Sequence, residues 1–236
     1  MSGHSKWASI KHQKGVADAK RAGVFTKLAN AITVAARAGA DPTMNFQLRL
    51  AIDRAKAANM PRTNIDRAIA RAAGPGAGAI EEVVYEAYGP GGAAILIEVA
   101  TDNKNRAIAE IKSVLNKYGG KLAGAGAVSY LFEKKGQIII SSGEKPADEV
   151  EMDIIESGAE DYEKSDNEYL VYTQPVVLES VKKILEDKSY EINEAKLLWE
   201  PKQQVTLDEE TSQKVINLLE ALDSLDDVTS VSSNIG

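Results

Sequence analysis

Cysteine is absent from the 236 residues, and histidine occurs only at His4 and His12. Without cysteine the chain has no disulfide, no thiolate nucleophile and no cysteine–zinc site, which fits a reducing compartment, and two histidines alone argue against a zinc site. The sequence also lacks a Gly-x-Ser-x-Gly nucleophile elbow and a Gly-Lys-Ser/Thr phosphate loop. We therefore expect no enzymatic activity, no metal and no cofactor.

Long apolar runs are missing as well. No stretch approaches the roughly 18 residues that a membrane span requires, and Met1 to Trp7 lack the apolar core of a secretory signal. A hydrophobic content of 44% still supplies enough apolar surface for packed cores. We expect a globular, cytoplasmic protein without a membrane partner, built from one large domain or from two to three small ones.

Glutamate does not occur in residues 1–75, and this segment is strongly basic. It has 13 Lys and Arg against 4 Asp, a net charge of +9, whereas residues 76–236 have 15 Lys and Arg against 31 acids, a net charge of −16. Charges more than about 8 Å apart are largely screened in physiological salt, so a phosphate group responds to the local charge and not to the total of −7. The segregation predicts an anionic partner for the N-terminal segment.

The first 30 residues hold six cations against the single acid Asp18. Ordinary solvated helix faces mix both signs, so we interpret this excess as a nucleic-acid-binding surface; the alternative is a solvated face with a chance bias. Arg67 and Arg71, four residues apart, lie on the outer side of a predicted helix. The cations predicted to contact nucleic acid are Lys6, Lys11, Lys14, Lys20, Arg21, Lys27, Arg67 and Arg71.

Aromatic residues are few in this segment: Trp7, Phe25 and Phe46. The two phenylalanines lie where core residues are expected, which limits base stacking and favours contacts to the backbone of duplex DNA or folded RNA. Trp7 is either a wedge or stacking residue, or an anchor for the segment around it. Charge alone does not separate DNA from ribosomal RNA, because both expose the same phosphates.

Apolar spacing predicts three helices in residues 1–75. The first helix spans Ala17 to Ala38. The second begins with Asp41 as N-cap and Pro42 at its first position, and Met44 lies on its apolar face. The third helix follows Pro61 and ends at Gly74. Residues 2–16 have no sustained apolar period, and we expect them to be loosely ordered without a charged partner.

Beyond a Gly/Pro-rich linker the pattern changes to α+β. A hairpin is predicted across the turn Gly89-Pro90-Gly91-Gly92, followed by a helix capped within Asp102-Asn103 and by a strand at Ala127–Phe132. Residues 137–200 then give a β-α-β-β-α-β order, which is ferredoxin-like. A final helix and strand cannot form a core alone, so we expect them to return to the first sheet. The predicted domains are 1–75, 80–135 with 203–236, and the inserted 136–202.

Three further features of the sequence are candidate sites. The run Asp102 to Arg106 is interpreted first as a helix cap; as a functional site, Lys104 and Arg106 at a helix N-terminus would suit a secondary phosphate contact. Paired acids such as Glu81/Glu82 and Asp226/Asp227 are interpreted as solvated surface. The turn at Gly89 precedes a strand rather than a helix, unlike a phosphate cradle.

Several separate motifs together resemble the YebC/PmpR family, over nearly the whole chain. They are Gly3-His4-Ser5-Lys6-Trp7, Ile10-Lys11-His12, Asp41-Pro42, Asn59-Met60-Pro61, Tyr85-Glu86-Ala87-Tyr88-Gly89-Pro90-Gly91-Gly92, Thr101-Asp102-Asn103-Lys104-Asn105-Arg106, Gly119-Gly120 and Phe132-Glu133-Lys134-Lys135-Gly136. The resemblance implies one helical and two α+β domains. It also implies that Lys6, Trp7, Lys11, His12 and Lys14 belong to an arm that contacts nucleic acid.

The function implied by the resemblance has two forms. Bacterial relatives are described as DNA-binding transcriptional regulators, which is our first expectation. Mitochondrial relatives act as translational activators, and bacterial ones are also linked to translation of proline-rich stretches on the ribosome, which makes a ribosome-associated translation factor the alternative. Neither role requires catalysis, and an enzyme using the acidic domains ranks third. We expect the acidic domains to orient the molecule by repulsion and to recruit or sense a protein partner.

Overall fold

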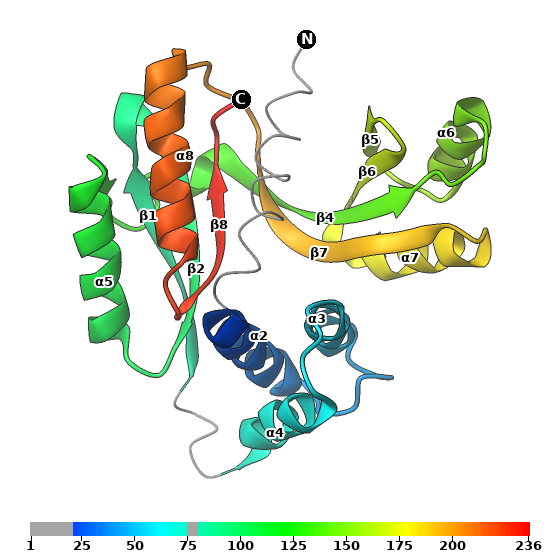
Figure 1. Ribbon diagram of the computed structural model, residues 1–236, viewed down its shortest axis with the longest axis horizontal. Coiled ribbons are helices and arrows are strands. Elements are labelled where there is room, and N and C mark those ends of the chain that lie inside the picture. The colour runs from blue at the N-terminus through cyan, green and yellow to red at the C-terminus, as the bar shows by residue number, and fades with distance from the viewer. Residues whose placement is uncertain (1–20, 75–79) are drawn as a thin grey trace. The chain divides into compact units, whose positions relative to one another are not determined.

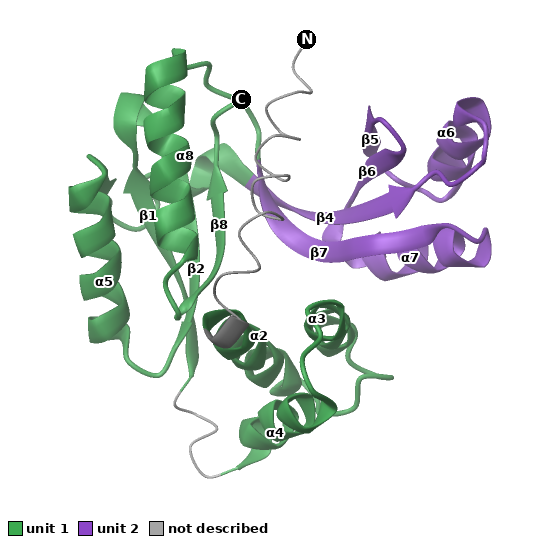
Figure 2. Ribbon diagram, viewed as in Figure 1, with its two compact units in different colours: residues 1–132, 201–236 green, residues 133–200 purple. Residues whose placement is uncertain are grey.

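The computed structural model describes residues 21–74 and 80–236 (Figure 1). The chain divides into two compact units, residues 1–132 with 201–236 and residues 133–200 (Figure 2). Within the described ranges, no helix is long and apolar enough to cross a membrane. Residues 2–16, which we predicted to be loosely ordered without a charged partner, lie outside these ranges. The N-terminal segment as a separate domain stays a prediction.

Three helices form the described part of the basic segment, as predicted, and we call them the helical head. Ile32, Leu48, Ala55 and Ile65 are buried in its core, because apolar residues recur at three- and four-residue spacing along each helix. The bounds of the three helices are α2 Arg21–Ala36, α3 Phe46–Ala57 and α4 Arg62–Ala73.

The predicted start of the second helix is wrong. Asp41 does not cap it: its carboxylate accepts a hydrogen bond from the Thr43 amide at 2.8 Å and closes a local turn. The N-cap is Asn45, whose side chain accepts from the Leu48 amide at 3.1 Å, so α3 begins four residues later than predicted. Met44 consequently precedes the helix and is 87% exposed instead of contributing to its apolar face.

The first sheet is built on a hairpin, as predicted. Strand β1, Glu81–Tyr88, pairs antiparallel with β2, Ala94–Thr101, across a short 3-10 turn at Pro90–Gly92. Gly91 has a φ of +69°, and a Cβ atom there would lie 2.8 Å from side-chain atoms of both Leu207 and Thr211. Glycine is therefore required at this position both by backbone conformation and by the close approach of the C-terminal segment.

The C-terminal helix and strand return to this sheet, which confirms the predicted insertion. Strand β8, Val228–Ser233, pairs with β2, and the two-residue strand β3, Lys121–Leu122, pairs with β1, giving the order β3-β1-β2-β8. Helices α5, Lys104–Lys117, and α8, Glu209–Asp223, lie side by side over the sheet (Figure 1). Buried residues of the sheet and of both helices form one core: Ile95, Ile97, Ile111, Leu115, Leu218 and Leu222.

The predicted strand at 127–132 is not formed, apart from Phe132, which begins the next strand. This segment is a loop with a 3-10 turn at Ser129–Leu131. The buried Glu86 carboxylate accepts hydrogen bonds from the amides of Gly126, Val128 and Ser129 at 2.6, 2.6 and 2.9 Å. Amides bound to a carboxylate cannot also pair in a strand ladder, so a single side chain from β1 sets the shape of this loop.

The second unit has the predicted ferredoxin-like topology. Its sheet order is β5-β6-β4-β7, the antiparallel arrangement that a β-α-β-β-α-β unit produces when each helix connects two strands that flank a third. Ile138, Ile140, Val150, Val181 and Leu185 are buried in this unit. The bounds are β4 Phe132–Ser141, α6 Ala147–Glu156, β5 Asp161–Ser165, β6 Glu168–Thr173, α7 Leu178–Asp187 and β7 Glu191–Pro201.

Candidate nucleic-acid interface

The described part of the N-terminal segment is basic: residues 21–74 hold nine Lys and Arg against three Asp. Arg21 begins α2, and its side chain lies outside the described part of the structure. The other predicted contacts of the N-terminal arm also lie outside the described residues: Lys6, Trp7, Lys11, His12, Lys14 and Lys20.

Arg67 and Arg71 are brought together in a groove between α2 and α4, which we call the α2–α4 groove. It is an open pocket of about 290 Å³. Both arginines are exposed, as the outward position predicted for them requires. The side chains that line the groove are Phe25, Thr26, Ala29, Asn30 and Thr33 of α2 and Asn64, Arg67, Ala68 and Arg71 of α4.

The helix period places these residues on one side of α4. Asn64, Arg67 and Arg71 are three and four residues apart, so their side chains project from successive turns along the groove. The two helices are fixed against each other by Thr33, whose hydroxyl lies 2.9 Å from the carbonyl oxygens of both Ala29 and Ala68. The hydrogen bond to Ala68 links α2 to α4 beside the groove.

The groove is positively charged and has a buried polar residue in its wall. Among residues 21–74 and 80–236, no acidic side chain lines it, and neither Arg67 nor Arg71 forms an ion pair. The amide of Asn30, 7% exposed, donates to the Ala100 carbonyl at 3.4 Å, and its oxygen lies 3.5 Å from an Arg71 nitrogen. Two guanidinium groups one helical turn apart without carboxylate partners are suited to bind phosphate.

Lys27 is placed differently from the other predicted contacts. Its ammonium lies 3.7 Å from a carboxylate oxygen of Asp223 and also donates to the main-chain carbonyl of that residue. The side chain is only 17% exposed. Lys27 therefore forms an intramolecular ion pair that joins α2 to the end of α8.

Lys104 and Arg106 are also paired with acids. Asn103 caps α5 through the Arg106 amide at 3.1 Å, which confirms the predicted cap. Lys104 lies 2.5 Å from a Glu81 carboxylate oxygen. Arg106 binds the Asp227 carboxylate at 2.8 Å, and these hydrogen bonds raise the pKa of its guanidinium. Arg106 also lies 3.1 Å from an Asp102 carboxylate oxygen, so a phosphate at this helix end would have to displace three carboxylates.

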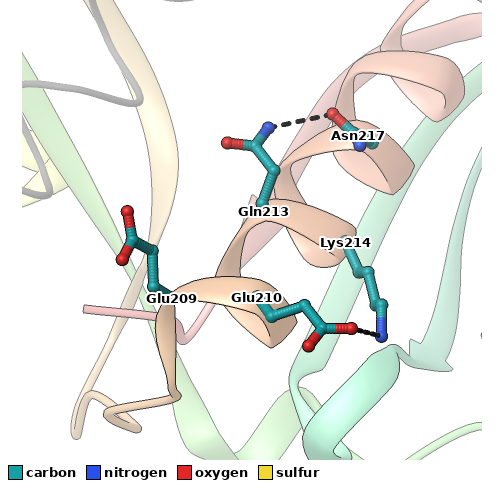
Figure 3. A pocket seen from close by; sticks show the side chains of 5 residues that line it. All are labelled: Glu209, Glu210, Gln213, Lys214 and Asn217. Carbon is teal, nitrogen blue, oxygen red and sulfur yellow. Dashed lines mark hydrogen bonds and ion pairs between the residues drawn. The ribbon is translucent and has the colours of Figure 1, made fainter.

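Another open depression, of about 460 Å³, lies along the first turns of α8 (Figure 3). Its polar side chains interact with neighbours on the same helix: Lys214 lies 2.7 Å from Glu210, and Gln213 donates to Asn217 at 3.0 Å. Such pairs at a spacing of four residues are typical of a solvated helix face. We assign no site to it.

Four polar residues of the groove were not predicted from the sequence as site residues: Thr26, Asn30, Thr33 and Asn64. The signal for Asn64 was present, because it lies on the same helix face as Arg67 and Arg71. Asn30 could not be found in this way, since its partner Ala100 lies 70 residues away in the sequence.

Comparisons with known proteins agree over almost the whole chain. The TACO1/YebC protein N-terminal domain matches residues 5–75, and the TACO1/YebC second and third domain matches residues 80–235. A probable transcriptional regulatory protein of Dictyoglomus turgidum is 48% identical, covering 99% of this chain and 95% of the relative, and one of Desulfitobacterium hafniense is 44% identical with the same coverage.

A solved structure supports the fold. The crystal structure of a conserved hypothetical protein from Aquifex aeolicus superimposes with a TM-score of 0.86 at 44% identity, covering 93% of this chain and 92% of the other. The fold defines a class of proteins with three parts, one helical and two α+β. These parts are the helical head, the sheet built on the hairpin, and the inserted ferredoxin-like unit. Within that class, the chain belongs to the TACO1/YebC family.

Proposed function

We propose that this chain is a non-enzymatic nucleic-acid-binding regulator, and specifically a transcriptional regulator that binds DNA in the cytoplasm through its basic N-terminal segment. The observation that carries the proposal is the segregation of charge: +9 in residues 1–75 against −16 in the remainder. Phosphate neutralisation supplies most of the sequence-independent affinity for nucleic acid, and it depends on local cations. The acidic remainder repels phosphate and so orients the basic segment toward it.

Two findings support this proposal. The relatives from Dictyoglomus and Desulfitobacterium carry the name of probable transcriptional regulatory proteins. The α2–α4 groove offers two arginines, and none of the described residues that line it is acidic. The N-terminal lysines Lys6, Lys11 and Lys14 would add backbone contacts, which fix position on a duplex without reading its sequence.

A ribosome-associated translation factor is the competing hypothesis. Its phosphate contacts would involve the same cations, because ribosomal RNA and DNA carry the same backbone charge. The two functions differ in what the full-length chain binds when both polyanions are present. Either function is compatible with a protein partner that binds the acidic residues 76–236. Pull-downs test for this partner with the full-length chain and with a variant in which Lys6, Lys11 and Lys14 are replaced. A protein that both chains retain, although the variant binds nucleic acid more weakly, is such a partner.

The test measures affinity across a salt series. If six cations of residues 1–75 other than Lys27 contact phosphates, log Kd should rise with log salt with a slope of about 5. Replacing Lys6, Lys11 and Lys14 with alanine should lower that slope by about three. The matched control replaces Lys112, Lys117 and Lys183, three exposed lysines of the acidic remainder, and should leave the slope unchanged.

The ligands distinguish the hypotheses. Promoter DNA that is retained in the presence of excess competitor DNA supports a transcriptional regulator. Co-sedimentation with ribosomes, lost in the triple lysine variant, supports the translation factor. If the full-length chain binds neither duplex DNA nor ribosomal RNA at low salt, the proposed function is wrong.

A further inference from the structure

The α2–α4 groove contains more than a phosphate contact requires. Exposed arginines on a helix suffice to contact the phosphates of a duplex backbone, and such contacts need no pocket. Here the arginines line a concave pocket together with the ring of Phe25 and the amide of Asn64. A pocket of about 290 Å³ lies near the lower limit, about 300 Å³, of sites that enclose a small molecule.

The cationic side of the groove matches a single phosphate. Side chains one helical turn apart have Cβ atoms about 5–6 Å apart, so the planar guanidinium groups of Arg67 and Arg71 can reach the same phosphate. Neither group is neutralised by a carboxylate in the described part of the chain, and the groove lining adds no acid.

The remaining lining matches a nucleobase. Phe25 is partly buried and packs against the head core, so its position is fixed, and an aromatic ring stacks on any base. Ala29 and Ala68 are small and leave space between the helices. The Asn64 side chain is partly exposed and carries both donors and an acceptor, the combination that pairs with the edge of a base.

We propose that the α2–α4 groove binds one unstacked nucleotide of the bound nucleic acid, with Arg67 and Arg71 on its phosphate and Phe25 and Asn64 on its base. This inference rests on the proposed function, because it names the ligand that one part of the basic segment takes. A perfect duplex keeps its bases stacked and offers the groove only phosphates. A bulge, loop or strand end supplies the nucleotide without the unstacking cost of a few kcal/mol that extrusion from a duplex requires.

The experiment compares two oligonucleotides with the full-length chain. One is a perfect duplex of about twenty base pairs, and the other is the same duplex with one unpaired nucleotide at its centre, each made as DNA and as RNA. The unpaired nucleotide should tighten binding about tenfold, since it saves part of the unstacking free energy. The DNA and RNA arms identify which nucleic acid supplies the nucleotide, because only RNA has a 2′-hydroxyl.

The variants separate the groove from general charge. Arg67→Ala, Arg71→Ala and Asn64→Ala should each reduce the preference for the bulged ligand. Arg54→Ala, an exposed cation of α3 that does not line the groove, should weaken both ligands equally. Arg67→Lys keeps the charge but loses the planar fork, so it should keep the salt slope and lose part of the preference. Thermal unfolding of each variant checks that the head remains folded.

Each outcome decides the proposal. Equal affinity of the wild-type chain for the bulged and the perfect ligand overturns it, while nucleic-acid binding itself stands. The same holds if the Arg67 and Arg71 variants weaken both ligands by one factor, because the arginines are then backbone contacts only. If the wild-type chain binds no oligonucleotide, the proposed function and this inference fail together.

Discussion

Lys27 and Asp223 are 196 residues apart in the sequence, yet the Lys27 ammonium lies 3.7 Å from the Asp223 carboxylate and donates to its main-chain carbonyl. The contact joins α2 of the helical head to the end of α8 and neutralises one of the six cations of the first 30 residues. A count of cations in the sequence therefore includes cations, such as Lys27, that are already paired within the chain.

The first prediction concerns this contact. Lys27→Met should lower the free energy of unfolding by about 0.5–1 kcal/mol, since it removes a hydrogen bond and the ion pair of a mostly buried lysine with a half-exposed aspartate. It should leave the salt slope of nucleic-acid binding unchanged. Lys14→Met is the matched control and should lower the slope by about one. Chemical denaturation and binding at several salt concentrations measure both quantities. A slope that falls by one in the Lys27 variant would show that this lysine contacts phosphate after all.

The second prediction concerns the Glu86 carboxylate. Burial raises the pKa of this carboxyl, but hydrogen bonds from the amides of Val128, Gly126 and Ser129 lower it by more, so its pKa lies below the usual 4.5. A carboxyl whose pKa is lowered by folding stabilises the protein above its unfolded pKa, and this contribution is lost as the pH falls through the folded value.

Glu86→Gln should therefore lower the free energy of unfolding by about 1–3 kcal/mol at pH 7, because an amide cannot accept three backbone hydrogen bonds as well as a carboxylate can. The difference between the two proteins should shrink below pH 4.5. The control, Glu82→Gln, changes an exposed residue of the same strand and should have little effect. A difference that does not depend on pH would contradict this account.

The third prediction concerns Asp153 in the ferredoxin-like unit. Hydrogen bonds from Lys188 at 2.5 Å and from the Tyr190 hydroxyl at 2.7 Å lower the pKa of its carboxyl to about 2. The side chain is 16% exposed, so solvent screens these contacts only in part. The linked stabilisation is about 2 kcal/mol at neutral pH and is lost as the pH falls from about 4 to about 2.

Asp153→Asn should remove this stabilisation and flatten the acid limb of the stability curve in that window. Glu144→Gln, at an exposed residue of the same unit, is the control. Urea denaturation followed by a probe in residues 133–200, at pH 7 and pH 3, measures the effect. An acid limb that is as steep in the Asp153 variant as in the wild type would rule out the assignment.

The fourth prediction compares two glycines. A Cβ atom at Gly136 would lie 2.9 Å from Leu178 Cδ1 and in conflict with the Thr173 hydroxyl, whereas a Cβ atom at Gly124 would meet no atom within 4 Å. Gly136→Ala should therefore destabilise the second unit by about 1–3 kcal/mol through overpacking of α7 on β4. Gly124→Ala should be neutral or slightly stabilising, because it reduces the freedom of the unfolded chain. Similar melting temperatures for the two variants would exclude close packing at Gly136.

Secondary structure was predicted best where a single period dominates. The β-α-β-β-α-β order predicted for residues 137–200 is the order observed. The predictions failed where side chains bind backbone amides: Asn45 caps α3 in place of Asp41, and Glu86 prevents a strand at 127–132. The apolar run at residues 127–132 does not reveal that the Glu86 carboxylate, about 40 residues earlier in the sequence, accepts hydrogen bonds from its backbone amides.

The candidate site also has a part that the sequence predicted and a part that it did not. The spacing of Arg67 and Arg71 predicted that both face outward from one helix, and the structure places them together. The sequence alone determined the charge of each segment, the family motifs and the order of helices and strands, because these depend on local composition and periodicity. Tertiary structure decided which cations stay open to a phosphate, because the acids that neutralise Lys27, Lys104 and Arg106 are brought close only by folding.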